Sequence, residues 1–209
     1  MRRCVIVGGA DIIRYDIMRR QLRDDDYIIY CDCGLKHMKE LNRTADLVVG
    51  DFDTYQGELP DSEIVRLPRE KDDTDTFFAA KEAVRRGFDE FLLLGTIGGR
   101  LDHTFANLSI LLMLDNLGKK AKAVDDYSEI WLLSKGTAYI DDDCKYFSTL
   151  NLSGTAEGII IKNAKYPLDN GKIEWDFQYG ISNEVLPGKR AEVSLKKGRL
   201  LIVKQFTDC

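Results

Sequence analysis

The sequence predicts an α/β fold in two parts. The first part is a mostly parallel sheet with helices on both faces, and the second is an antiparallel β-domain, a sandwich or open barrel. Up to about residue 125, short apolar runs alternate with stretches of helical spacing, which is typical of a parallel sheet covered on both faces. After that point, strand-like runs follow one another between turn residues without long helical patterns. We therefore expect domains over residues 1–125 and 126–209.

The first domain begins with a buried strand and then alternates helices with strands. Strands are expected at residues 4–7, 27–30, 46–49, 64–67, 91–94 and 121–124. Helices are expected at residues 11–23, 35–41, 77–88 and 101–117. Apolar residues recur every three or four positions between Phe77 and Phe88, and Gly118 ends the last helix. This order of elements is that of a Rossmann-like domain.

The second domain shows short strand patterns separated by turns. Strands are expected at residues 130–133, 137–140, 146–152, 158–162, 173–177, 191–195 and 200–205. Turns are expected at residues 135–136, 169–171, 187–188 and 197–198, where glycine follows Lys, Asn or Pro. Trp175, in one of these strands, is expected to be packed in the interior, although it is also a candidate shelf for a flat cationic ligand.

Composition narrows the class of protein. An apolar content of 44% in 209 residues excludes disorder, and a net charge of −5 with mixed signs argues against nucleic acid or a membrane surface as partner. No apolar stretch approaches the length of a membrane span, and the N-terminal apolar run is too short for a signal peptide. The five cysteines lack metal-site spacing, which indicates free thiols in a reducing compartment. We expect a soluble cytoplasmic protein.

Acidic residues follow the expected second and third strands. Asp32 follows the second, and Asp51 and Asp53 follow the third within Gly50-Asp-Phe-Asp-Thr54. Residues two apart in extended chain share a face, so both carboxylates of this motif could meet one hard cation such as Mg²⁺. The alternative is an Asp-rich turn that bonds its own backbone. Because ligands of open parallel sheets bind at the carboxyl ends of the strands, we favour the cation site.

A second acidic cluster precedes the third helix, in Lys71-Asp-Asp-Thr-Asp-Thr76. One of Asp73, Thr74 and Asp75 is expected to cap that helix. A remaining carboxylate could bind metal, and Lys71 could neutralise phosphate charge.

A glycine-rich turn precedes the fourth helix, in Gly95-Thr-Ile-Gly-Gly-Arg-Leu-Asp-His-Thr-Phe-Ala-Asn107. Backbone N–H groups at such a turn are expected to point outward, where they attract phosphate. Gly98 permits close approach of a ligand, and Arg100 either binds phosphate in bidentate fashion or is simply exposed. Asp102 is a candidate helix cap. His103 shares a helical face with Asn107, and we expect a structural role for it.

Several common catalytic motifs are absent from the sequence. There is no GxxxxGK[ST] phosphate loop, no GxGxxG after the first strand and no GxSxG elbow. With two histidines in the whole chain, a histidine-dependent triad is poorly supported.

Taken in order, the motifs resemble those of thiamine pyrophosphokinases. The resemblance rests on Gly50-Asp-Phe-Asp-Thr54, Thr74-Asp75, Gly98-Gly-Arg-Leu-Asp-His103 with Asn107, Ala164-Lys-Tyr-Pro-Leu168, Gly180-Ile-Ser-Asn-Glu184 and Lys197-Gly-Arg-Leu-Leu201. It spans nearly the whole chain. One departure is Asp32-Cys33-Gly34, where the family often has Asp-Gly-Gly; another is Val7-Gly8-Gly9-Ala10, where it usually has Asn-Gly.

The resemblance implies an N-terminal α/β domain, a C-terminal β-sandwich and a homodimer with the active site between subunits. It implies transfer of pyrophosphate from ATP to the hydroxyl of thiamine, with release of AMP. Asp51, Asp53 and Asp75 would hold Mg²⁺. Asp32, Lys71, Thr74, Gly98, Arg100 and Asp102 would lie around the nucleotide, and Ser182 and Asn183 near thiamine.

Two other classes of function are weighed against this one. Asp51-Phe-Asp53 after an apolar strand is similar to the DxDx[TV] motif of phosphohydrolases with an aspartyl nucleophile, but Tyr55 stands where that motif wants Thr or Val. A non-catalytic sensor of thiamine or nucleotide is the other alternative, and the full set of ligand-type residues argues against it.

Overall fold

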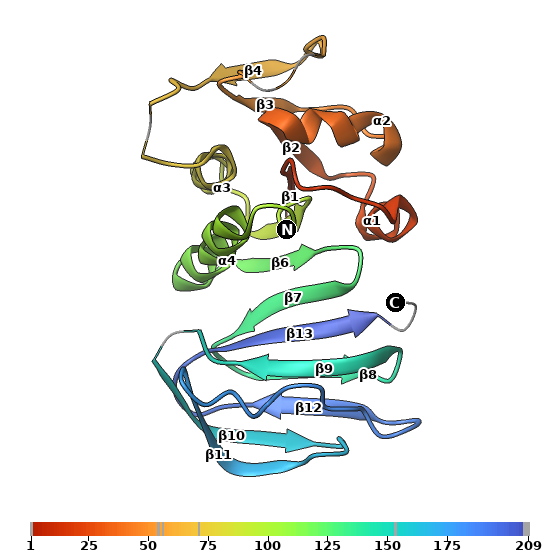
Figure 1. Cartoon of the computed structure of the whole chain (residues 1–209), viewed down its shortest axis with the longest axis vertical. Helices are drawn as coiled ribbons and strands as arrows, with labels where there is room; N and C mark the ends of the chain where they lie inside the picture. Colours follow the sequence, from red (N-terminus) through yellow and green to blue (C-terminus); the bar gives the residue numbers. More distant parts are fainter. Residues whose placement is uncertain (1, 54, 56, 71, 153, 207–209) are drawn as a thin grey trace. The chain divides into compact units, whose positions relative to one another are not determined.

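The computed structural model describes residues 2–206 except 54, 56, 71 and 153. It divides into two compact units, Met1–Asp126 and Tyr127–Cys209 (Figure 1). The expected α/β part followed by an antiparallel β-domain is confirmed. None of the described helices has the length and hydrophobicity needed to cross a bilayer. Cys4, Cys31, Cys33 and Cys144 carry free thiols, and Cys209 lies outside the described residues.

The first unit is built on a parallel sheet with strand order β4-β3-β2-β1-β5-β6. Its strands are β1 (Arg3–Val7), β2 (Tyr27–Cys31), β3 (Leu47–Gly50), β4 (Glu63–Arg66), β5 (Glu90–Leu94) and β6 (Lys120–Val124). From β1 the chain moves outward to β4 and then returns to the other side of β1 as β5. The boundary between β1 and β5 is therefore the switch point of the sheet, where ligands of such folds bind.

Helices lie on two sides of these strands. They are α1 (Tyr15–Gln21), the 3₁₀ helix η1 (Asp32–His37) with α2 (Met38–Leu41), α3 (Asp75–Arg85) and α4 (Leu101–Asn116). In Figure 1, α3 and α4 lie on one side and α1 and α2 on the other. Every residue of β1 is buried, whereas the edge strand β4 is mostly exposed. This agrees with the continuous apolar runs, which parallel strands need when both faces are covered.

The second unit is an antiparallel sandwich. One layer holds β7 (Ser128–Leu133), β13 (Leu200–Phe206) and β9 (Cys144–Leu150), and the other holds β11 (Leu168–Glu174), β10 (Thr155–Lys162), β12 (Arg190–Ser194) and β8 (Thr137–Asp141). Inward side chains from both layers form one apolar core, which includes the buried Phe147 and Ile173. Of the two shapes expected for this part, the sandwich is the correct one.

The turn expected at residues 169–171 is wrong. These residues lie inside β11, and Asn170 takes a left-handed φ of 53° there. The pairing of β11 with β10 shifts register at Glu157/Ile159 and at Ile159/Ile161. An Asn-Gly pair is suited to positive φ, and here that conformation is absorbed by strand bulges instead of a reversal of the chain.

Candidate functional site

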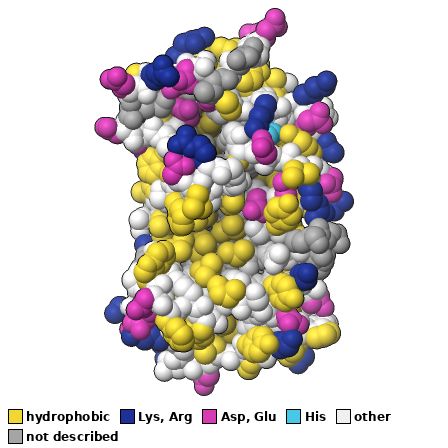
Figure 2. Space-filling model, viewed as in Figure 1, with side chains coloured by type: hydrophobic (Ala, Val, Ile, Leu, Met, Phe, Trp, Pro, Cys, Tyr) yellow, Lys and Arg dark blue, Asp and Glu magenta, His cyan; other side chains and the backbone are white. Residues whose placement is uncertain are grey.

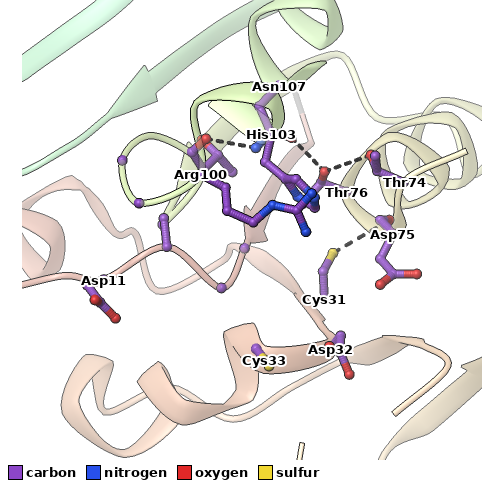
Figure 3. A pocket seen from close by; sticks show the side chains of 17 residues that line it. Asp11, Cys31, Asp32, Cys33, Thr74, Asp75, Thr76, Arg100, His103 and Asn107 are labelled. Carbon is purple, nitrogen blue, oxygen red and sulfur yellow. Dashed lines mark hydrogen bonds between the residues drawn. The ribbon is translucent and has the colours of Figure 1, made fainter. Parts of the chain in front are cut away.

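A pocket of about 390 Å³ lies at the carboxyl ends of β1, β2 and β5 in the first unit. Its wall consists of residues that follow these strands, together with the start of α3 and one face of α4 (Figure 3). The lining residues are Gly8, Gly9, Ala10, Asp11, Cys31, Asp32, Cys33, Thr74, Asp75, Thr76, Gly95, Thr96, Gly98, Gly99, Arg100, His103 and Asn107. Segments distant in the sequence therefore meet at the switch point, as parallel topology requires.

Close backbone contact holds the ends of β1 and β5 together at the floor of this pocket. Gly8 N donates to Leu94 O at 2.8 Å, and Ala10 N donates to Gly95 O at 2.9 Å. Gly95 has a φ of 58°, and a Cβ there would lie 2.5 Å from Gly8 O. Glycine is the residue that meets both demands, which is why the strand ends can approach.

Three carboxylates converge beside the pocket. Ligand atoms of Asp32, Asp51 and Asp53 all lie within 4.8 Å of one another. The approach of β3 to Asp32 depends on Gly50, because a Cβ on Gly50 would lie 3.0 Å from the Cβ of Asp32. Carboxylate oxygens at this spacing fit a hard divalent cation such as Mg²⁺ or Ca²⁺.

The backbone between Asp51 and Asp53 is not extended. Phe52 has a left-handed φ of 58°, and the guanidinium of Arg66 lies 5.1 Å from the centre of its ring. The two carboxylates do come together, but the extended-chain reason for expecting this is wrong. A bulky residue rarely takes positive φ, and such conformations concentrate at functional sites.

The expected metal ligands Asp51, Asp53 and Asp75 are only partly grouped. Within the described part of the chain, the three-carboxylate group contains Asp32 and not Asp75. Asp75 lies in the first turn of α3 and lines the pocket, as Asp32 does. Asp32, which the resemblance places near the nucleotide, therefore belongs both to the carboxylate group and to the pocket wall. Lys71 lies outside the described residues.

Arg100 and Asp102 pair with each other at the start of α4. Arg100 Nε lies 3.2 Å from Asp102 Oδ1, and both side chains are exposed. The hydrogen bond from Arg100 lowers the pKa of Asp102 to about 2, and the pKa of Arg100 is raised in return. Arg100, not Asp102, is the N-cap residue of α4, and of the two residues Arg100 lines the pocket. The expected capping role of Asp102 is therefore wrong.

The glycine-rich turn is hydrogen-bonded to the first turn of α4 through the Thr104 hydroxyl. Gly98 N donates to Thr104 Oγ1 at 3.1 Å, and Thr104 Oγ1 donates to Arg100 O at 3.2 Å. The N–H of Gly98 thus has a partner inside the protein, so the expectation that the N–H groups of this turn point outward fails at this position.

Sequence reasoning missed part of the pocket. His103 is exposed and lines it, so its side chain is not packed in the interior, and the structural role expected for it stays a prediction. Asn107, one turn later, lines the same pocket but is buried. The four-residue spacing of His103 and Asn107 was the available signal, since it places both on one face of α4. In the loop after β1, which also lines the pocket, the sequence offered only the pair Gly8-Gly9 as a signal.

The residues expected near thiamine lie in the second unit. Ser182 is exposed with a φ of 56°, whereas Asn183 is 5% exposed. The Asn183 amide donates to Tyr166 O at 2.8 Å and accepts from Tyr166 N at 3.0 Å. Contact of either residue with thiamine stays a prediction.

The second unit also carries aromatic and aliphatic side chains on its surface. Trp175 is 58% exposed, so its expected burial is wrong. Exposed large hydrophobic side chains of this unit also include Tyr139, Tyr166, Phe177, Tyr179 and Ile181. Figure 2 shows hydrophobic side chains among the surface atoms of this part of the chain.

The sheet order, with a pocket at its switch point, places the chain among doubly wound α/β proteins with an appended β-sandwich. Family models agree in both units: thiamin pyrophosphokinase, catalytic domain, matches residues 18–123, and thiamin pyrophosphokinase, vitamin B1 binding domain, matches residues 137–200. The chain belongs to the thiamin pyrophosphokinase family, which confirms the resemblance in the motifs.

Relatives and solved structures agree. A thiamine pyrophosphokinase of Bacillus subtilis is 29% identical over 137 residues, which cover 65% of this chain and 64% of that relative, less than two thirds of its length. A thiamin pyrophosphokinase structure from Geobacillus thermodenitrificans is 27% identical with a TM-score of 0.84, covering 99% of this chain and 98% of the other. A Bacillus subtilis structure at 23% identity has a TM-score of 0.87 over 99% and 100% of the two chains, which supports the fold.

Proposed function

We propose that this chain transfers pyrophosphate from ATP to thiamine, giving thiamine diphosphate and AMP. The observation that supports it most is the gathering of Asp32, Asp51 and Asp53 beside a pocket at the switch point of the sheet. Clustered carboxylates beside a pocket of this volume suit the binding of a metal–nucleotide complex. Membership of the thiamin pyrophosphokinase family supplies the substrate class.

In the proposed reaction, the hydroxyl oxygen of thiamine attacks the β-phosphorus of ATP in line with the departing AMP oxygen. A new O–P bond forms, the bond from the β-phosphorus to the bridging oxygen of AMP breaks, and the hydroxyl proton passes to a carboxylate of the site. Positioning and charge stabilisation are the main sources of rate in such transfers.

Each site residue then has a proposed task. Asp32, Asp51 and Asp53 would hold Mg²⁺, with Asp75 as a further candidate ligand from the pocket wall. Bound Mg²⁺ would neutralise charge on the phosphates. Arg100 would exchange its exposed partner Asp102 for a phosphate oxygen, and Thr74, Gly98 and Lys71 would lie along the nucleotide.

Thiamine would bind through the second unit, near Ser182 and Asn183. We propose that the protein acts as a homodimer with the active site between subunits, because an exposed set of aromatic side chains is suited to burial against another surface. We place the reaction in the cytoplasm, where the free thiols of Cys4, Cys31, Cys33 and Cys144 stay reduced.

The decisive experiment follows the products of purified protein with ATP, thiamine and Mg²⁺. Equal amounts of AMP and thiamine diphosphate are expected. Formation of ADP or free phosphate, or a phosphoaspartate trapped at Asp51, would replace the proposal with a phosphohydrolase. Saturable binding of thiamine without any product would replace it with a sensor. Omission of Mg²⁺, with EDTA present, is the matched control and should abolish turnover.

A further inference from the structure

Asn107 joins two walls of the pocket through its buried amide. Its Nδ2 donates to Thr96 O at 2.7 Å, and its Oδ1 accepts from Thr76 Oγ1 at 2.6 Å (Figure 3). Thr96 belongs to the turn after β5, and Thr76 belongs to the first turn of α3. Asn107, Thr76 and Thr96 are all at most 9% exposed, so these bonds form away from bulk water.

The chemistry of these groups fixes the direction of each bond. A carbonyl oxygen can only accept, so the Asn107 amide must present its NH₂ to Thr96 and its oxygen to Thr76. Thr76 has one hydroxyl proton, and it is used toward Asn107. In the 3.2 Å contact between Thr74 Oγ1 and Thr76 Oγ1, Thr74 must therefore be the donor.

The chain of bonds continues into the helix. Thr74 Oγ1 accepts from Phe77 N at 3.2 Å, which makes Thr74 the N-cap of α3. The Sγ of Cys31 lies 3.8 Å from Asp75 O and donates to it from the end of β2. The first turn of α3, which carries Asp75, is thus held from two sides. Its connection to the turn after β5 runs through Asn107.

We propose that Asn107 is a positioning residue that sets the spacing between the first turn of α3 and the glycine-rich turn, and thereby the fit of the pocket to a nucleoside triphosphate. The inference rests on the proposed function. The inference also says how Thr74 acts: its hydroxyl proton is directed toward Thr76, so toward a phosphate Thr74 contributes the orientation of α3 and not a donated hydrogen bond.

The first test substitutes Thr76, whose hydroxyl is the link between Asn107 and Thr74. Thr76→Val keeps the shape of the side chain and removes the hydroxyl, whereas Thr76→Ser keeps the hydroxyl. We expect the KM for ATP to rise about tenfold in Thr76→Val with little change in kcat, because a lost positioning bond weakens ground and transition states alike. Thr76→Ser should remain within about threefold of wild type.

The second test asks whether Thr76 and Asn107 act as one unit. Asn107→Leu should raise the KM for ATP by a similar factor, and the double variant with Thr76→Val should be little worse than the worse single variant. Asn116→Leu, an exposed asparagine at the other end of α4, is the matched control and should leave KM unchanged. Multiplied losses in the double variant, or lower melting temperatures with an unchanged KM, would overturn the proposal.

A third measurement separates this inference from the proposed function. Hydrogen exchange at the Phe77 amide of the free protein should accelerate in Asn107→Leu and in Thr76→Val, but not in Thr76→Ser or Asn116→Leu. This readout needs no substrate. If wild-type protein forms no thiamine diphosphate while exchange behaves as expected, the proposed function fails and the linkage stands. If turnover is normal and Phe77 exchange is unchanged in both variants, the linkage fails.

Discussion

Both units bury asparagine side chains, and they use them differently. In the first unit, Asn107 lies in the wall of a pocket and joins two segments that follow different strands. In the second, the Asn183 amide forms two hydrogen bonds with the backbone of Tyr166, and the Asn151 amide donates to Gly154 O and Ile173 O. The amide does the same chemistry in each case, which is to satisfy buried backbone and hydroxyl groups.

The difference follows from sheet topology. A parallel sheet leaves all its carboxyl ends at one edge, so the polar groups that fasten its loops also surround the space between them. A sandwich closes its core with inward apolar side chains, and its buried amides hold loops against that core. We therefore expect substitutions around the pocket of the first unit to affect chemistry first, and substitutions in the core of the sandwich to affect stability first.

The largest expected effect is at the carboxylate group of the first unit. Asp53→Asn should lower turnover by about a thousandfold, since loss of a group that holds charge at a transition state costs that order. Its melting temperature should stay near wild type, because Asp53 is exposed. Asp61→Asn, a nearby exposed aspartate, is the control and should be fully active. Near-normal turnover in Asp53→Asn would remove this residue from the metal site.

A comparable loss, but of stability, is expected in the second unit. Phe147 is 1% exposed in the core of the sandwich, and Phe147→Ala should cost about 3 to 4 kcal/mol of unfolding free energy. Phe177 is 65% exposed, and Phe177→Ala should cost less than about 0.5 kcal/mol. Urea denaturation measures both. Equal losses would mean that the sandwich core is not where this unit gains its stability.

A smaller effect on stability is expected from the titration of His37, whose side chain is 1% exposed. Its Nε2 donates to Ala10 O at 2.9 Å and its Nδ1 accepts from the Tyr15 hydroxyl at 2.7 Å, an arrangement of the neutral ring. Burial lowers the pKa of His37 below its usual value of 6.5. Below pH 6.5 the unfolded chain therefore binds a proton that the folded protein does not, so stability falls with falling pH.

The substitution His37→Gln tests this dependence. Between pH 7 and pH 5 the wild type should lose stability through this group, and the variant should lose less. Thermal unfolding over that range is the measurement. His103→Gln, the same substitution at an exposed position, is the matched control. An unchanged slope in His37→Gln would show that the ring is not buried in its neutral form.

The smallest expected effect on stability is at the pair of Arg100 and Asp102. Its hydrogen bond lowers the pKa of Asp102 from 3.8 to about 2, so the paired state is complete above pH 3.8 and is lost as pH falls toward 2. Both side chains are exposed, and water screens their attraction. Asp102→Asn should leave the melting temperature at pH 7 unchanged. A clear drop would show that this pair orders the glycine-rich turn before any ligand binds.

Much of the fold could be predicted because each helix and strand is specified by residues within its own segment. Continuous apolar runs predicted the parallel strands, and helical spacing with Thr74 before α3 predicted that helix. The ordered motifs predicted the family, which is confirmed. The Asn-Gly pair at residues 170–171 predicted a turn and was wrong, because the same positive φ also suits a bulge inside β11.

The sequence by itself determined the alternation of elements, the residues at the carboxyl edge and the family. Tertiary structure decided which carboxylates meet. Asp32 joins Asp51 and Asp53 because Gly50 lets β3 approach it, whereas Asp75 lies apart in the first turn of α3. It also decided that Phe52 is left-handed and that Asn107 joins two loops. Local patterns record what each segment prefers, but distances between segments arise only when their backbones pack.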